Sequence, residues 1–359
     1  MSLSFPFDLV WPTSGYVVLY LVTLLMHALF MSYVLGGALA VAFVRLHGVR
    51  ENGPVTRTFI DWLPFALSAA ITAGVAPLLF VQILYQREFY TANLLSFHRW
   101  MSILPVLIGA FYLLYLLKAR PHARRLSAAV ASAVALSILF VAWSWIENHM
   151  LSLNPSVWAK QYESGALAYR DPAVFLRLAF WVALALPTAF WLLVLQLRFG
   201  ASGAKPEEAL FATRRLAPVA LGFLLVAAAL APFVLRGTWS LSSVDEALLD
   251  GADRPYLVLA AVGVVLTLGG WLRAQHLPRL SGLCVALGSL GLALTWWGVL
   301  CARELIRLAR LDLDTLTRRH AELATSSGLF VFLVFAVLAL AVTAWIFRRV
   351  SCALRQPVG

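Results

Sequence analysis

Three histidines lie where an imidazole could bind a metal or carry a proton. His27 is in the middle of the apolar run LYLVTLLMHALFMSYVLGGALAVAF, whereas His98 (SFHRW) and His149 (WIENHM) lie at the edges of apolar segments. A neutral imidazole in hydrocarbon needs a partner, because an unsatisfied polar group is costly there. That partner can be a hydrogen-bonding group on a neighbouring helix or a haem iron, for which histidine is a common axial ligand. The residues alone leave both alternatives open for His27.

The surroundings of His27 suit either alternative. Phe30, Met31 and Val34 follow on the same helical face, and the pair Gly36-Gly37 would let a flat macrocycle or another helix approach closely. His27 lies roughly 16 Å below the start of its apolar segment, whereas His98 and His149 are near the rim. Ligation of one haem by two of these histidines therefore does not follow from the sequence.

Glu147 and three arginines are the charged candidates near the same rim. Glu147 precedes His149 by two residues and is flanked by tryptophans. Its carboxylate could hydrogen-bond an imidazole, relay a proton, influence a haem propionate, or lie at the interface within an aromatic belt. Guanidinium groups suit haem propionates, because these accept bidentate, charge-assisted hydrogen bonds. They also suit lipid phosphates, which is the default interpretation. The arginines are Arg87, Arg99 and Arg177.

The other histidines and the cysteines suggest no site. Four histidines lie in loops or charged stretches, which predicts solvated or headgroup-contacting side chains. They are His47, His122, His276 and His320. The three cysteines form no metal-binding spacing and no C-x-x-C-H motif for covalent haem.

The composition places these candidates in a membrane. The chain has 359 residues, 62% of them hydrophobic and 13% charged, whereas soluble domains carry about 25% charged residues. A membrane span takes roughly 20 apolar residues. The sequence therefore predicts an all-α, polytopic helical bundle forming a single membrane domain, 1–359, with about nine spans. Spans 1 to 9 are expected at about 16–44, 60–86, 101–118, 127–148, 174–198, 216–235, 255–272, 281–302 and 328–347.

The positive charges indicate topology. The net charge is +11, but the basic residues lie in loops between apolar segments, which is typical of membrane topology and not of a nucleic-acid-binding surface. The loops after odd-numbered spans, with the C-terminal tail, hold the larger share of Lys and Arg. The positive-inside rule then predicts an outer N-terminus and an inner C-terminus. The first 16 residues lack the basic region and cleavage site of a signal peptide, so we expect span 1 to be retained.

Three segments resemble subunit I of the cytochrome bd-type quinol oxidases. HALFMSYVLGGALAVAF is similar to the first helix of that family, AITAGVAPLLFVQILYQREFY to its second, and AWSWIENHMLSLNPSVW to the end of its fourth. A weaker similarity lies in TWWGVLCARELIRL, where Glu304 and Arg307 keep the spacing of the family's haem-ligating glutamate and nearby arginine. The resemblance implies a nine-span protein with haem b, in which His27 and Glu304 bind iron and Arg307 belongs to the cofactor site. The alternative for Glu304 and Arg307 is a solvated position in a charged juxtamembrane helix. Glu147, His98 and His149 are further cofactor-site candidates by their own positions, because outer loops can fold back onto a macrocycle.

The chain also departs from the family. Spans 5 and 7 contain neither His nor Met, so the ligands of the family's low-spin haem are missing. The glutamate pair of the third helix is missing too, and the loop after span 6, where the family oxidises quinol, is short. Reduction of dioxygen is therefore doubtful.

The resemblance implies a membrane-embedded b-type cytochrome subunit in a bacterial-type inner membrane. It would transfer electrons between the quinone pool and an outer-side redox partner, with further membrane or outer-side redox subunits, surrounded by lipid. Whether the chain is itself an enzyme stays open. The alternative is a haem-free membrane anchor subunit of a respiratory or other complex. A transporter is disfavoured, because carboxylates within the spans are few and no internal repeat is visible.

Overall fold

The computed structural model describes residues 7, 9–48, 53–119, 124–199, 204–236 and 254–324, together with scattered positions between 330 and 348. Within these ranges the chain is helical and contains no strand. Eight helices of this part are long and apolar enough to cross a membrane. They are α1 (Thr13–His47), α2 (Pro54–Leu84), α4 (Phe97–Ala119), α5 (Arg124–Ser152), α7 (Pro172–Arg198), α8 (Pro206–Arg236), α10 (Arg254–Ala274) and α11 (Gly282–Leu308).

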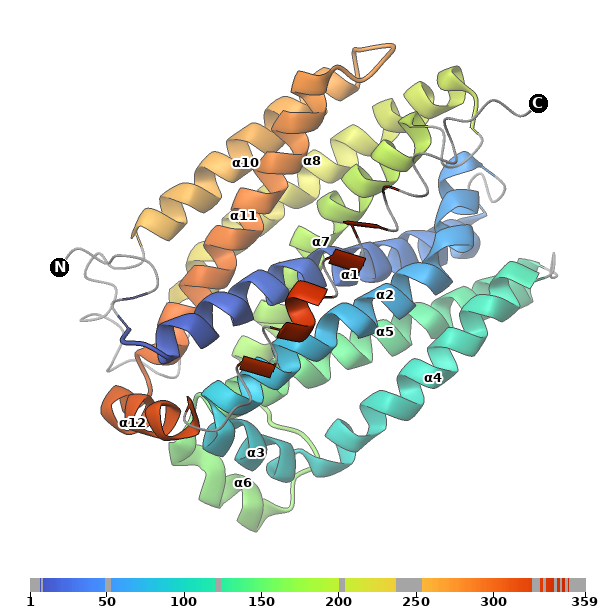
Figure 1. Cartoon of the computed structure of the whole chain (residues 1–359). Helices are drawn as coiled ribbons and strands as arrows, with labels where there is room; N and C mark the ends of the chain where they lie inside the picture. Colours follow the sequence, from blue (N-terminus) through green and yellow to red (C-terminus); the bar gives the residue numbers. More distant parts are fainter. Residues whose placement is uncertain are drawn as a thin grey trace.

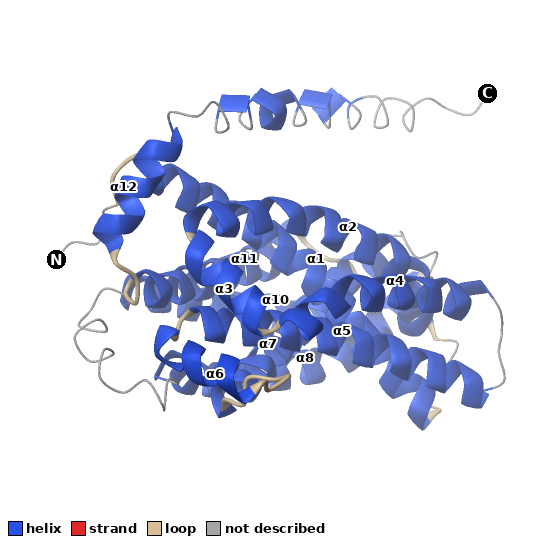
Figure 2. Ribbon diagram, turned by 90° about the horizontal axis from the view of Figure 1, so that it is seen from below, coloured by secondary structure: helices blue, strands red, loops and turns tan. Residues whose placement is uncertain are grey.

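These eight helices coincide with the first eight predicted spans, so the all-helical, multi-pass architecture is confirmed. The ninth predicted span, 328–347, is described only at scattered positions, so it is not established as a span, and most of the loop after span 6 lies outside the described residues. Four shorter elements complete the described part, namely α3 (Gln86–Leu95), the 3₁₀ turn η1 (Pro155–Val157), α6 (Trp158–Ser164) and α12 (Leu313–Ala324). Figures 1 and 2 place α3, α6 and α12 at the same end of the bundle, which we call the α12 end.

Local chemistry explains where several helices begin and end. The Asp171 carboxylate accepts a hydrogen bond from the Ala173 backbone N–H (2.8 Å) at the start of α7. Ser281 Oγ accepts one from Cys284 (3.2 Å) at the start of α11. Such side-chain acceptors satisfy the first backbone donors of a helix. α1 ends at Gly48, whose φ of 68° is a left-handed conformation that favours glycine.

Helix α1 is the central element of the bundle and contacts α2, α5, α7 and α11. Two glycines allow its neighbours to approach. A Cβ at Gly36 would lie 2.5 Å from Ala189 Cβ on α7, and one at Gly37 would lie 2.8 Å from Phe59 Cδ1 on α2. The Gly36-Gly37 pair therefore accommodates neighbouring helices, as small residues commonly do in membranes.

The stretch after span 8 is divided between two helices. α11 extends beyond the predicted span to Leu308, and α12 begins after a short turn. Asp312 precedes α12 and accepts hydrogen bonds from the Thr315 backbone N–H (3.3 Å) and hydroxyl (2.5 Å). These bonds lower the pKa of the exposed Asp312 carboxyl, so it stays ionised at the positive end of the α12 dipole.

Candidate functional site

Three of the predicted site residues meet at the α12 end. The Arg307 guanidinium donates from Nη2 to His149 Nδ1 at 2.7 Å, and its Nη1 lies 3.7 Å from Glu304 Oε2. Arg307 is 5% exposed, His149 8% and Glu304 0%. The last turns of α5 and α11 thus bring together residues that are 158 positions apart in the chain.

Two tyrosines and a second arginine complete this site. The Tyr85 hydroxyl donates to Glu304 Oε1, and Arg303 Nη1 donates to the Tyr20 hydroxyl at 3.0 Å. The Arg307 guanidinium also lies over the Tyr85 ring, 4.5 Å from its centroid, where a cation is attracted by the π-electrons. We call this group the His149–Arg307 cluster; it consists of Tyr20, Tyr85, His149, Arg303, Glu304 and Arg307.

The hydrogen bonds of His149 fix its tautomer. An arginine only donates, so Nδ1 of His149 must be the acceptor and the ring proton must be on Nε2. Arg303 Nη2 approaches the same Nδ1 at 3.4 Å. Nε2 is buried and has no hydrogen-bond partner among the described residues. His149 therefore presents an N–H donor, and not a lone pair, at its second nitrogen.

The cluster carries an excess of positive charge. Arg303 and Arg307 contact it from α11, whereas Glu304 is its one carboxylate. Arg177 on α7 is buried too, at 4% exposed, but it makes interactions of its own and is not counted in this excess. Positive charge away from water is costly unless an anion compensates it.

His27 lies apart from this cluster. Its Nδ1 is 3.0 Å from the Ala70 backbone carbonyl on α2, and because a carbonyl only accepts, Nδ1 carries the proton. Gly74, one turn further along α2, faces the ring: a Cβ there would lie 3.0 Å from His27 Cε1 and Nδ1. This is the interhelical hydrogen bond expected for an imidazole in hydrocarbon, and it leaves the Nε2 lone pair uncommitted to Ala70.

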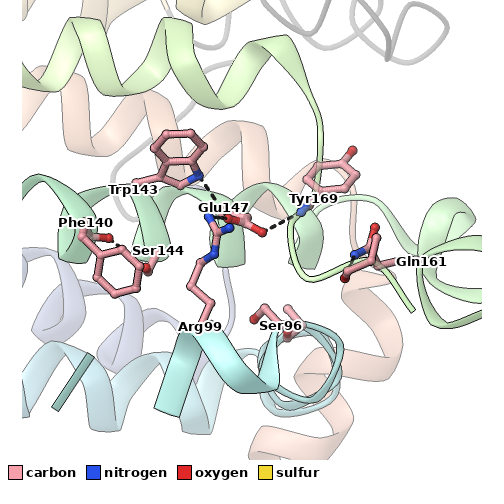
Figure 3. A network of polar contacts seen from close by, with 10 residues as sticks. Ser96, Arg99, Phe140, Trp143, Ser144, Glu147, Gln161 and Tyr169 are labelled. Carbon is pink, nitrogen blue, oxygen red and sulfur yellow. Dashed lines mark hydrogen bonds and ion pairs between the residues drawn. The ribbon is translucent and has the colours of Figure 1, made fainter. Parts of the chain in front are cut away.

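Glu147 holds together three parts of the chain. Its carboxylate accepts hydrogen bonds from the Arg99 guanidinium on α4, from Trp143 Nε1 (3.1 Å) and from the Tyr169 backbone N–H (2.6 Å), as Figure 3 shows. Its side chain is 1% exposed. Glu147 therefore fastens the segment before α7 to α4 and α5, and these three hydrogen bonds involve no imidazole.

Two further histidines differ in their exposure. His98 is exposed near the start of α4.

The prediction of a solvated His320 is wrong: this residue is 0% exposed, and its Nδ1 lies 2.9 Å from Thr13 Oγ1. α12 is amphipathic, and its His320 side turns toward α1 although the surrounding sequence, TRRHAEL, is polar. Burial lowers the pKa of His320.

Sequence reasoning missed Tyr20, Tyr85 and Arg303. Tyr20 precedes His27 by seven residues and so lies on the same face of α1, which is a signal that could have been used. Tyr85 follows α2 and meets Glu304 across 219 positions, a pairing that no local pattern indicates. Arg303 lies one turn before Arg307 on α11, and nothing in its charged stretch of sequence distinguishes it from the neighbouring arginines.

No protein-family model and no curated protein matches this chain. Over the described ranges, no three His, Cys, Asp or Glu side chains gather as they would around a bare metal ion. An axial haem ligand needs no such group, because the porphyrin supplies the other nitrogens.

Proposed function

We propose that the chain is a membrane b-type cytochrome subunit, similar to cytochrome bd subunit I, which transfers electrons between quinol and an outer-side redox partner. The observation that carries the proposal is the orientation of the His27 ring. Its Nδ1–H is directed at the Ala70 carbonyl, which leaves the lone pair on Nε2. Metal-binding histidines commonly have this arrangement: a hydrogen bond on one nitrogen fixes the tautomer, and the other nitrogen binds the metal.

The residues around His27 fit an axial ligand of haem b. When bound, haem supplies the one-electron redox change. His27 would hold the iron, the Ala70 carbonyl would keep the ring in one tautomer, and Gly74 would leave space for the ring against α2.

Glu304 is the second proposed ligand, and it belongs to a different level of the bundle. Its Oε2 has no hydrogen-bond partner among the described residues. Gly74, beside His27, and Tyr85, beside Glu304, are about three turns apart on α2, or roughly 16 Å. His27 and Glu304 would therefore serve two separate haems. His149 is less suited to iron, because its Nε2 carries the proton while Arg307 occupies Nδ1.

We also propose that the α12 end faces the outer side of a bacterial-type inner membrane. The distribution of loop charges supports this orientation. Arg318 and Arg319 are exposed on α12, where positive charge could steer an acidic redox protein toward the chain. Quinol would reach the bundle from the lipid.

The test compares His27→Ala with His98→Ala in the purified full chain. The sequence makes His98 a candidate, but its side chain is exposed near the start of α4, so His98→Ala is the matched control for loss of an imidazole. We expect haem b bands in the reduced-minus-oxidised spectrum of the wild type and of His98→Ala. In folded His27→Ala the content of bound haem should fall by roughly half or more. Unchanged haem content in His27→Ala would remove His27 from the site.

A second candidate function is a haem-free membrane anchor subunit. The same hydrogen bond favours it, because the Ala70 carbonyl already gives the His27 imidazole a partner within the bundle. A purified chain that lacks haem after expression with adequate haem supply would place this candidate first.

A further inference from the structure

Two buried N–H donors in the His149–Arg307 cluster lack acceptors. His149 Nε2 and Arg307 Nε are both inaccessible to solvent, and neither has a hydrogen-bond partner among the described residues. Both side chains are more than nine-tenths buried. A buried donor without an acceptor is strongly unfavourable, and buried polar groups in native structures are nearly always paired. Two such donors in contacting residues indicate an acceptor that the described part of the chain does not provide.

The charge balance identifies the kind of acceptor. Among the described residues of the cluster, Glu304 is the one carboxylate that opposes Arg303 and Arg307, and it already accepts from Tyr85. A neutral acceptor would satisfy the N–H groups but leave the excess charge. An oxyanion would do both, because arginine forms its strongest hydrogen bonds with carboxylates and phosphates.

We propose that the His149–Arg307 cluster is a binding site for an oxyanion, a carboxylate or a phosphate carrying at least one negative charge. His149 would donate from Nε2, and Arg307 and Arg303 would supply the positive charge. This site goes beyond the proposed function and does not require His27 to bind iron. Two sources have the chemistry: the propionates of a haem, and the phosphate of an anionic lipid whose headgroup enters at the α12 end.

The test uses two charge variants with opposite expected effects. Arg307→Gln removes a donor and a positive charge, so oxyanion binding should weaken about tenfold or more. Glu304→Gln keeps an acceptor for Tyr85 but removes the competing negative charge. The preference for the charged ligand, protohaem over its dimethyl ester or phosphatidylglycerol over phosphatidylcholine, should therefore increase, independently of any iron bond to Glu304, because that bond would affect protohaem and its ester equally. Because a misfolded protein would not bind more tightly, the second variant keeps the test informative if the first does not fold. Arg125→Gln, an exposed charge loss at the start of α5, is the control and should leave binding unchanged.

Two arms distinguish the sources. In the first, the full chain is titrated with protohaem and with its dimethyl ester, in which the propionates are uncharged. In the second, retention of phosphatidylglycerol against phosphatidylcholine is measured by native mass spectrometry. A preference for free protohaem that disappears in Arg307→Gln assigns the site to propionates. A preference for phosphatidylglycerol that disappears in the same variant assigns it to lipid phosphate, even if no haem binds. If neither preference responds to Arg307→Gln or Glu304→Gln, the oxyanion site is refuted.

Discussion

The three candidate histidines differ in what their ring nitrogens do. His27 donates from Nδ1 to a backbone carbonyl, which leaves a lone pair on Nε2. His149 accepts at Nδ1 from Arg307, which leaves a proton on Nε2. His98 is exposed. The lone pair makes His27 a proposed metal ligand, and the N–H makes His149 a proposed hydrogen-bond donor to an anion. In each case the hydrogen-bond partner of Nδ1 decides which role Nε2 can take.

At the residue scale, the space beside His27 can be tested with a methyl group. Gly74→Ala would place a Cβ 3.0 Å from the imidazole, so the ring must move away from the Ala70 carbonyl. We expect a lower melting temperature and, if haem is bound, less of it. The control is Gly109→Ala, because a Cβ there meets nothing within 4 Å and alanine is the better helix former by up to about 1 kcal/mol. Equal behaviour of the two variants would show that the contact is unimportant.

The Tyr85 hydroxyl is the second residue-scale test. Burial raises the pKa of Tyr85 well above its ordinary value, and the charge of Glu304 raises it further. The phenol therefore stays protonated and donates to Glu304 at every usable pH. Tyr85→Phe removes this donor and should destabilise the protein by about 1–3 kcal/mol, as measured by denaturant unfolding in detergent. Tyr90→Phe, on the exposed side of α3 (44% exposed), should change stability little; a comparable loss there would contradict the assignment.

At the element scale, hydropathy was sufficient to predict eight helices but not their partners. A continuous apolar run marks α1 or α7 without any alignment, because a backbone in lipid must form its hydrogen bonds internally. Local signals also mark ends, such as Asp171 before α7. The Arg307–His149 pair joins α11 to α5, and that pairing depends on which helices are neighbours, which hydropathy does not determine. His320 was misread because the polarity of its stretch conceals the buried face of α12.

The Glu147 carboxylate is the element-scale prediction, because it fastens the segment 153–171 to the ends of α4 and α5. Glu147→Gln weakens its hydrogen bonds to Arg99 and to the Tyr169 backbone, since a neutral amide is a poorer acceptor. Trypsin should then cut after Lys160 and Arg170 several-fold faster than in the wild type. Glu163→Gln on the exposed face of α6 should not change the rate. Equal rates for the wild type and Glu147→Gln would show that this contact does not hold the segment.

At the scale of the whole molecule, the α12 end is where distant parts of the chain converge. Helix α12 packs against the start of α1 and the end of α2, and His320 meets Thr13 across 307 positions. The same end contains the His149–Arg307 cluster, whose residues come from α1, α5, α11 and the residue after α2. Docking of α12 and the order of this cluster are therefore expected to depend on each other, because Tyr85 and Leu308 belong to one hydrophobic core against which Leu316 of α12 packs.

Docking of α12 should depend on pH through His320. Burial lowers its pKa in the folded protein, the charge of Arg319 lowers it further, and the carbonyls of Ile83 and Leu84 partly oppose the shift. An undocked histidine has a pKa near 6.5, so below about pH 6.5 the undocked state binds more protons and docking weakens as the pH falls. Hydrogen exchange of residues 313–324 should be slow at pH 8 and, after correction for intrinsic rates, become faster toward pH 5. His320→Asn keeps a polar group beside Thr13 but does not titrate, so its exchange should be independent of pH over this range. Protection that persists unchanged to pH 5 in the wild type would mean that protonation of His320 does not control α12.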